Sequence, residues 1–224
     1  MTHPKKNKGF TLIEIAMLLV VIGLLLGAIL IGQELISNTK VKGYASDFHN
    51  IPIMLYSYQD RFKESPGDDA QVGSHLPGAA PATTPAGTVG NGAIDGVWNS
   101  PTNSDETCLF WQHVRLAGLT PGSTTVNCAA NADYWPKNAN GGQIGIQSKS
   151  GFVTMTGDMR GSYIICSSNI LGQYVLRLDA LIDDGDPATG SMLAIQQSAL
   201  GGAPSTTATV QANPADSFVV CMSM

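Results

Sequence analysis

The sequence predicts an α+β protein in which a long N-terminal helix packs on a C-terminal domain built around an antiparallel sheet. Residues 10–31 are apolar along almost their whole length, and Glu14 is their only ionisable side chain. Apolar residues then recur at helical spacing as far as Phe62. Short β-type runs with brief connections follow from Gln143 onward. We therefore expect one helix and one globular domain.

The apolar segment 10–31 is long enough to cross a membrane. Its 22 residues would span roughly 33 Å as a helix, about the thickness of the hydrocarbon core of a bilayer. Lys5, Lys6 and Lys8 precede it, which predicts that this side is cytoplasmic. A carboxylate such as that of Glu14 costs about 2.5–3.5 kcal/mol at mid-bilayer, so its presence there requires a reason.

The order of residues from Lys8 to Glu14, Lys-Gly-Phe-Thr-Leu-Ile-Glu, resembles the cleavage and methylation motif of type IV prepilins and type II secretion pseudopilins. The resemblance implies that residues 1–9 are a leader, removed between Gly9 and Phe10 by a prepilin peptidase. Phe10 would then be N-methylated, and Glu14 would meet the Phe10 ammonium of a neighbouring subunit. Pairing two charges that are each costly to bury would fix the register of assembly.

Two simpler interpretations fit the N-terminus less well. An ordinary signal peptide has an apolar core of 7–15 residues, and its cleavage site follows that core. Here the apolar run is longer, and Gly9 precedes it. A plain single-pass anchor explains the run and the lysines, but it leaves Glu14 unexplained.

The resemblance also implies partners and a location. The partners would be other pilin subunits, the prepilin peptidase, an inner-membrane assembly platform and the membrane itself. The precursor would be a single-pass inner-membrane protein with a periplasmic C-terminal domain. After assembly it would lie in an extracellular pilus or a periplasmic pseudopilus.

The length favours a minor pilin over a bulk pilin, because removal of nine residues from 224 leaves a long mature chain of 215. A type II secretion pseudopilin is one alternative. A filament-borne adhesin or ligand-binding subunit is another, and it would use loops at 73–104 and 201–214.

The composition argues against nucleic-acid binding and against catalysis. The chain has 12 Lys and Arg against 17 Asp and Glu, and loss of three leader lysines would leave a net charge of −8, unsuited to binding phosphates. No Gly-x-Ser-x-Gly, phosphate-binding loop or His-Glu-x-x-His motif occurs. We expect no enzyme and no cofactor, apart from the calcium ion considered below.

The second half of the predicted helix 10–62 is one-sided. Its apolar residues are spaced alternately by three and four, as expected for a helix packed against a domain: Val41, Tyr44, Phe48, Ile51, Leu55, Tyr58 and Phe62. Pro52 lacks an amide hydrogen and predicts a kink near Phe48. Ser65-Pro66-Gly67-Asp68-Asp69 ends the helix, so the C-terminal domain should comprise residues 63–224.

Four cysteines lie in that domain, and none forms a Cys-x-x-Cys pair. An even number beyond an export segment predicts two disulfides. Three pairings are open. We favour Cys108–Cys128, which closes a local loop, and Cys166–Cys221, which joins a middle strand to the last one.

The C-terminal domain begins with a loop and a helix. Residues 73–104 show no apolar periodicity and read as a loop, and turn chemistry explains Gly90–Gly96 better than a calcium loop does. Ser104 is the expected cap of a helix that runs to Gly118. His113 on this helix is expected to be a packed residue and not a ligand.

The remainder predicts strands and a second helix. Five β-type runs suggest an antiparallel sheet of four or five strands: Gln143–Gln147, Phe152–Thr156, Ser162–Cys166, Met192–Ile195 and Ser217–Cys221. Ser168 or Asn169 should cap a helix that ends at Asp183. Residues 201–214 read as a polar loop.

Three segments of this domain resemble a group of minor-pilin-like proteins: Ser65–Asp69, Cys108–Leu119 and Leu178–Gly190. In the last of them Asp183, Asp184 and Asp186 place three carboxylates within four residues at a helix C-terminus, where the helix dipole disfavours anions. A bound calcium ion is one explanation. Amide or arginine partners within the turn, or screening by salt, are others.

Overall fold

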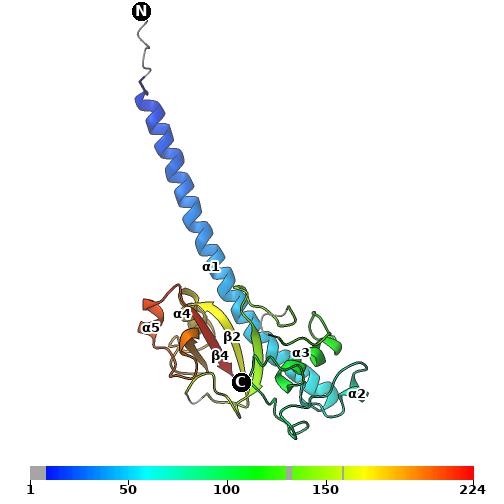
Figure 1. The fold of residues 1–224 in the computed structure, drawn as a ribbon. Helices are drawn as coiled ribbons and strands as arrows, with labels where there is room; N and C mark the ends of the chain where they lie inside the picture. Colours follow the sequence, from blue (N-terminus) through cyan, green and yellow to red (C-terminus); the bar gives the residue numbers. More distant parts are fainter. Residues whose placement is uncertain (1–8, 130–132, 158) are drawn as a thin grey trace, which may run out of the picture. The chain divides into compact units, whose positions relative to one another are not determined.

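A computed structural model describes residues 9–129, 133–157 and 159–224 (Figure 1). The chain forms two compact units, one ending at Thr39 and one running from Lys40 to Met224, which we call the head unit. The elements are α1 (Leu12–Phe62), α2 (Val72–His75), α3 (Glu106–Leu116), β1 (Ile144–Ser148), β2 (Tyr163–Leu171), α4 (Gly172–Ile182), β3 (Met192–Gln196), η1 (Gln197–Ala199), α5 (Thr207–Ala212) and β4 (Ser217–Ser223). This is the predicted α+β fold.

The head unit is built on a four-stranded antiparallel sheet in the order β1-β2-β4-β3. Both faces of the sheet are buried. Successive side chains of a strand point to opposite faces, and in β2 they enter two different hydrophobic clusters. Ile165 of β2 joins the cluster that includes α1, α3 and α4, whereas its neighbours Ile164 and Cys166 join a second cluster on the opposite face. Trp98 and Met155 from loops complete that second cluster.

The second half of α1 supplies a large part of the first cluster. Five members of the predicted stripe are buried in it: Val41, Tyr44, Phe48, Ile51 and Leu55. Tyr58 is also fully buried, in a smaller cluster with Val72 and Leu76. The helix passes through Pro52 without interruption, so the proline expected to kink it does not divide it. Since these side chains lie in the core, the head unit contains its own stretch of α1.

Both disulfides favoured from the sequence are present. Cys166 and Cys221 lie directly opposite each other on β2 and β4, with Cα atoms 4.1 Å apart. Cys108 at the start of α3 is bonded to Cys128, with Cα atoms 6.1 Å apart. One bridge therefore joins the two central strands, and the other closes a local loop.

One predicted strand was wrong. Phe152–Thr156 forms no ladder; it covers the second face of the sheet as a loop, with Met155 buried there. Its backbone pairs with another loop instead, since the Thr156 amide donates to Gly202 and the Gly201 amide donates to Thr154. Of the apolar residues that suggested a strand, Phe152 and Met155 pack onto the sheet, whereas Val153 is exposed.

The predicted caps of two helices were also wrong. Strand β2 continues to Leu171, past a register shift between Ser167 and Ile170. Asn169 lies at that shift with φ 55°, and α4 begins only at Gly172. Ser168 and Asn169 are held instead by the segment before β1: the Ser168 amide donates to the Gln143 carbonyl, and the Asn169 side-chain amide donates to the Asn140 carbonyl at 2.9 Å. At α3 the capping position is Asp105, not Ser104.

The predicted loop 201–214 contains a short helix, α5, that the sequence did not reveal. Thr206 caps it, and the Thr206 hydroxyl accepts from the Thr209 amide at 3.3 Å. Val210 is its only buried residue. One apolar contact in six residues leaves no periodicity to recognise.

If the second half of α1 belongs to the core, truncating a buried residue there should destabilise the head unit. Phe48→Ala should lower the free energy of unfolding by about 3–5 kcal/mol, because it removes a fully buried ring. Tyr56→Ala is the control on the same helix, since Tyr56 is 56% exposed, and it should cost less than about 0.5 kcal/mol. Urea unfolding of the full chain in detergent would be followed by the fluorescence of Trp98, Trp111 and Trp135, all buried in the head unit. Equal losses in the two variants would contradict this packing.

Candidate functional site

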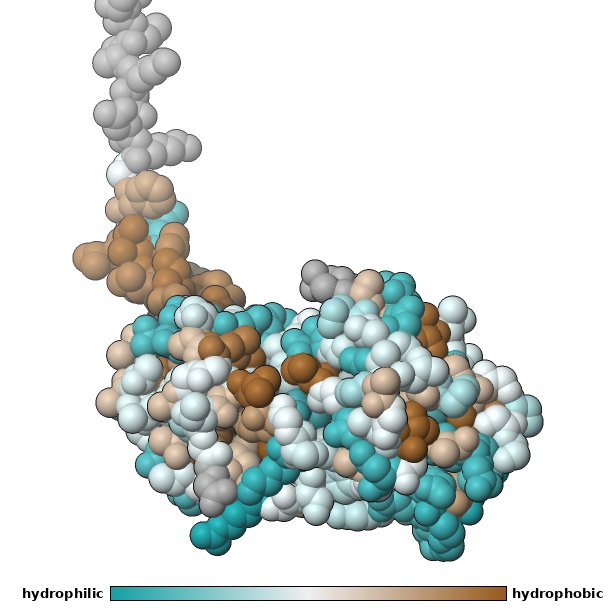
Figure 2. Space-filling model, turned by 60° about the horizontal axis from the view of Figure 1, so that its bottom comes forward, coloured by the Kyte–Doolittle hydropathy of each residue, from teal (hydrophilic) through white to brown (hydrophobic). Residues whose placement is uncertain are grey.

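The N-terminal part of α1 carries an apolar surface that the described chain leaves uncovered. Phe10 is 81% exposed and Leu12 is 92% exposed, and the large apolar residues that follow as far as Ile31 are also exposed. By length and composition this helix can cross a membrane. In Figure 2 the visible part of the helix is mainly brown a short way beyond the grey atoms, whereas the head unit is mainly teal, white and pale brown with scattered brown patches. Such a surface needs lipid or another apolar partner.

Thr11 and Glu14 form a reciprocal capping pair at the start of α1. The Thr11 amide and hydroxyl both donate to Oε2 of Glu14 at 2.8 Å. In return, the Thr11 hydroxyl accepts from the Glu14 amide at 3.3 Å. This is the capping-box arrangement, which satisfies amide donors that the first turn of a helix leaves free. The only carboxylate in the apolar segment is therefore oriented by its own chain.

The Glu14 carboxylate can still accept hydrogen bonds from a cationic group of another molecule, because a carboxylate has about four acceptor positions. Gly9 and Phe10 immediately precede the capping pair. The leader predicted for residues 1–9 lies outside the described residues except for Gly9. Cleavage after Gly9, methylation of Phe10 and contact between Glu14 and a second subunit stay predictions.

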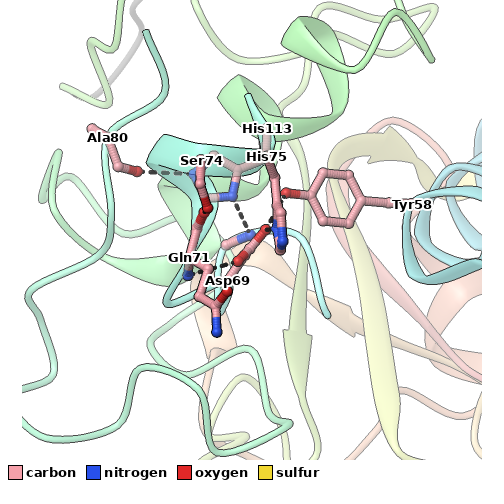
Figure 3. A network of polar contacts seen from close by, with 8 residues as sticks. Tyr58, Asp69, Gln71, Ser74, His75, Ala80 and His113 are labelled. Carbon is pink, nitrogen blue, oxygen red and sulfur yellow. Dashed lines mark hydrogen bonds and ion pairs between the residues drawn. The ribbon is translucent and has the colours of Figure 1, made fainter. Parts of the chain in front are cut away.

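A second polar cluster lies at the far end of α1 (Figure 3). The Tyr58 hydroxyl donates to Oδ2 of Asp69 at 2.8 Å, and Nδ1 of His75 lies 2.7 Å from the same oxygen. Oδ1 of Asp69 accepts from the Gln71 amide at 2.8 Å. Asp69 is completely buried, so these partners replace its hydration. The carboxylate fixes the turn that follows α1.

His113 completes this junction as a packed residue. Its Nδ1 accepts from the Gly67 amide at 2.9 Å, and its Nε2 donates to the Ala80 carbonyl at 2.9 Å. One ring nitrogen accepts and the other donates, which is the pattern of a neutral imidazole. Burial lowers the pKa of His113. The ring therefore links α3 to the segments on either side of α2, in a structural role.

Two further buried carboxylates hold the loop that follows α2. Asp68 accepts from the amides of Gly90, Asn91 and Gly92. Glu106, the first residue of α3, accepts from the Thr88 hydroxyl and the Asp95 amide, both at 2.7 Å. The Gly- and Asn-rich segment Gly90–Gly96 is therefore a loop, and the buried carboxylates of Asp68 and Glu106 hold its backbone in place.

The sequence analysis missed the structural roles of Asp68, Asp69 and Glu106, all of which are completely buried. From the sequence, Asp68 and Asp69 belong only to the segment that ends the long helix. A signal was present, because two adjacent acids follow Pro-Gly directly after an amphipathic helix. Their hydrogen-bond partners come from residues 58–95, and the chain brings these residues together only when it folds.

The predicted calcium ligands are only partly together. Asp183 and Asp184 follow the last residue of α4, and both lie near Asp179. Asp186 is turned elsewhere, since its Oδ1 accepts from the Ala188 amide and the Thr207 hydroxyl, both at 3.2 Å. Burial above all, together with the nearby charges of Asp184 and Asp183, raises the pKa of Asp179 to about 7.

The two loops suggested as a ligand-binding surface approach each other at one place. A shallow groove of about 220 Å³ is lined by Val97 and Asn99 from the first loop and by Leu200 and Gly201 next to the second, with Val153 between them. Val97, Val153 and Leu200 are exposed apolar residues.

The buried Glu106 should make the head unit less stable as the pH rises. Burial raises the pKa of Glu106 to about 7, against the lowering effect of its two hydrogen bonds. A raised pKa means that the folded state holds the proton more tightly. The contribution is therefore complete below about pH 4.5 and lost as the pH rises through about 7, which corresponds to about 3 kcal/mol.

Glu106→Gln should reduce the fall in unfolding free energy between pH 4.5 and pH 7.5 by about that amount. Urea unfolding at the two pH values, followed by tryptophan fluorescence, measures it. Asp60→Asn changes an exposed acid and should leave the pH dependence unchanged. The same fall in wild type and in Glu106→Gln would show that Glu106 does not titrate in this range.

A comparison with protein families matches residues 4–30 to the prokaryotic N-terminal methylation motif. No curated protein and no solved structure was found to match the chain. The matched residues include Gly9, Phe10 and the Thr11–Glu14 pair, and they extend over most of the exposed apolar segment. The chain therefore carries, at residues 4–30, the N-terminal methylation motif that is characteristic of type IV pilin and pseudopilin precursors.

Proposed function

We propose that this chain is the precursor of a minor subunit of a type IV pilus-like filament. It is inserted in the inner membrane, cleaved after Gly9 by a prepilin peptidase, N-methylated at Phe10 and assembled through its apolar helix. The observation that carries the proposal is the exposed apolar segment with a single carboxylate, placed directly after Gly9–Phe10 within the matched motif. The role is structural, and no catalysis is proposed.

The interior of a filament would remove the apolar segment from water, as the bilayer does. Apolar residues on all sides of the helix from Phe10 to Ile31 are exposed in the single chain. Helices that exchange lipid neighbours for one another keep this surface away from water. Glu14 then meets the Phe10 ammonium of an adjacent subunit, and the pair offsets the cost of burying either charge alone.

The head unit suits an exported protein. Its two disulfides form and persist in oxidising compartments such as the periplasm. We therefore place the head unit in the periplasm before assembly and on the outside of the filament afterwards. The assembly platform and other pilin subunits are the proposed partners.

Glu14→Gln tests the assembly step. Glutamine keeps the capping role at this position but cannot pair with an ammonium, so an assembled subunit would bury a charge without a partner. We expect the amount of subunit in filaments sheared from cells to fall at least about tenfold, with an unchanged amount in the membrane fraction. Immunoblots of both fractions measure this.

Glu34→Gln is the matched control, because Glu34 is an exposed acid of the same helix beyond the apolar segment. It should assemble as wild type does. Wild-type levels of Glu14→Gln in sheared filaments would contradict the proposed role of this carboxylate. Wild-type subunit absent from sheared filaments, yet required for export of folded proteins, would favour a secretion pseudopilin over a pilus subunit.

A further inference from the structure

A completely buried carboxylate lies at the C-terminal end of α4, beside two others. Asp179 has no exposed surface, Asp183 is half-buried and Asp184 is exposed. One carboxylate oxygen from each residue lies within 4.8 Å of those of the other two. The three acids therefore converge on one small volume, although they come from the last turns of a helix and from the turn after it.

Asp179 is the member that makes this cluster unusual. Its Oδ1 accepts from the Gly185 amide at 2.6 Å, but its Oδ2 is buried with no hydrogen-bond partner. A buried polar atom without a partner carries its full desolvation cost, and more so when it belongs to a charged group. Nearly all buried polar atoms in folded proteins have a partner. The bare oxygen of Asp179 therefore points to a partner that the chain itself does not supply.

The other two carboxylates are oriented from outside the cluster. Oδ2 of Asp183 accepts from the amides of Ser191 and Met192 at 2.6 and 2.9 Å. Asp184 accepts from the Asp186 amide at 2.9 Å and the Thr189 hydroxyl at 2.7 Å. Since a carboxylate has about four acceptor positions, each of these two groups still has positions free for a further partner.

The missing partner should be a cation. Three carboxylates repel one another, and the negative end of the α4 dipole adds to the repulsion. In the part of the chain that the structure describes, the ion pairs involve Asp60, Asp69 and Asp133, and none of the three clustered acids. A set made only of oxygens suits a hard divalent ion.

We propose that Asp179, Asp183 and Asp184 bind one Ca²⁺ ion. Oxygens bound to one Ca²⁺ at about 2.4 Å lie at most about 4.8 Å apart, and Ca²⁺ accepts irregular geometry, whereas Mg²⁺ demands a near-ideal octahedron of about 2.0–2.1 Å. Asp186 is not a ligand, because it is not one of the acids whose oxygens converge within 4.8 Å, and its Oδ1 faces Ala188 and Thr207 instead. Asp179 replaces Asp186, the third ligand predicted from the sequence.

The bound ion would stabilise the turn that connects α4 to β3. Asp183 already holds the first amides of β3, and β3 pairs with β4 along the sheet. Binding would therefore stabilise the folded head unit. Sites of this kind in extracellular modules bind Ca²⁺ with dissociation constants of about 10⁻⁴–10⁻³ M. This inference concerns the head unit alone and stands or falls independently of filament assembly.

The test is thermal unfolding of the full chain in detergent, followed by tryptophan fluorescence with a chelator or with about 10 mM Ca²⁺. For wild type we expect Tm to rise by about 3–10 °C with Ca²⁺. Asp179→Asn and Asp184→Asn should lose this rise. Asp184 is exposed, so that variant should fold even if Asp179→Asn does not. Asp186→Asn is the matched control, a neighbouring acid outside the cluster, and should keep the rise.

The results separate a site from general screening. Isothermal titration should give one Ca²⁺ per chain for wild type and Asp186→Asn, with at least about tenfold weaker binding for the other two variants. No rise in wild type would overturn the proposal. So would an equal rise in all four proteins, or an equal rise with KCl of matched ionic strength. An equal effect of Mg²⁺ would overturn the choice of calcium.

Discussion

The central constraint on this protein is an apolar helical surface that the chain does not cover itself. From Phe10 to Ile31 every side of α1 is exposed, and water is an unfavourable neighbour for such a surface. The polar groups of Thr11 and Glu14 in this segment are hydrogen-bonded to each other within the first turn. The segment can therefore remain in a bilayer as a single chain or exchange lipid for the equivalent helices of other subunits. In the bilayer and among the helices of other subunits alike, the apolar surface is kept away from water.

The rest of α1 obeys a different constraint. Beyond Lys40 its apolar stripe, from Val41 to Tyr58, is buried in the head unit, whereas Tyr56 on another face is exposed. The end of the helix is then fixed by buried acids, of which Asp69 holds Tyr58 and His75, while Asp68 holds the loop at Gly90–Gly92. These contacts are internal to the head unit, so the end of α1 does not depend on partners. The helix thus serves an intermolecular function in one half and an intramolecular function in the other.

The sequence predicted the elements that depend on local pattern. The apolar run and the one-sided stripe follow from periodicity. The pairing of Cys166 with Cys221 was one of three open possibilities, favoured because it joins a middle strand to the last one, and the structure contains it. The strand expected at Phe152–Thr156 was wrong because a short apolar run packs equally well on a sheet or within one. Helix α5 gave no signal, since only Val210 is buried in it.

The polar clusters were harder to predict for a physical reason. Asp179 follows Val175 by four residues and lies on the buried face of α4, where it is completely buried although an acid is ordinarily exposed. Glu106 is similar at the start of α3. Burial of such groups depends on partners that tertiary folding brings from distant segments, as Thr88 is brought to Glu106. A pattern within one segment carries no record of those partners.

The most direct test of this account is mass spectrometry of the protein in filaments sheared from cells, compared with the membrane fraction. The account predicts a mature chain that begins at N-methylated Phe10 in the filament fraction, in small amounts relative to a bulk pilin. An abundant mature chain would make it a bulk subunit instead. A chain that begins at Met1 and stays in the membrane would contradict the account and leave a membrane-anchored domain.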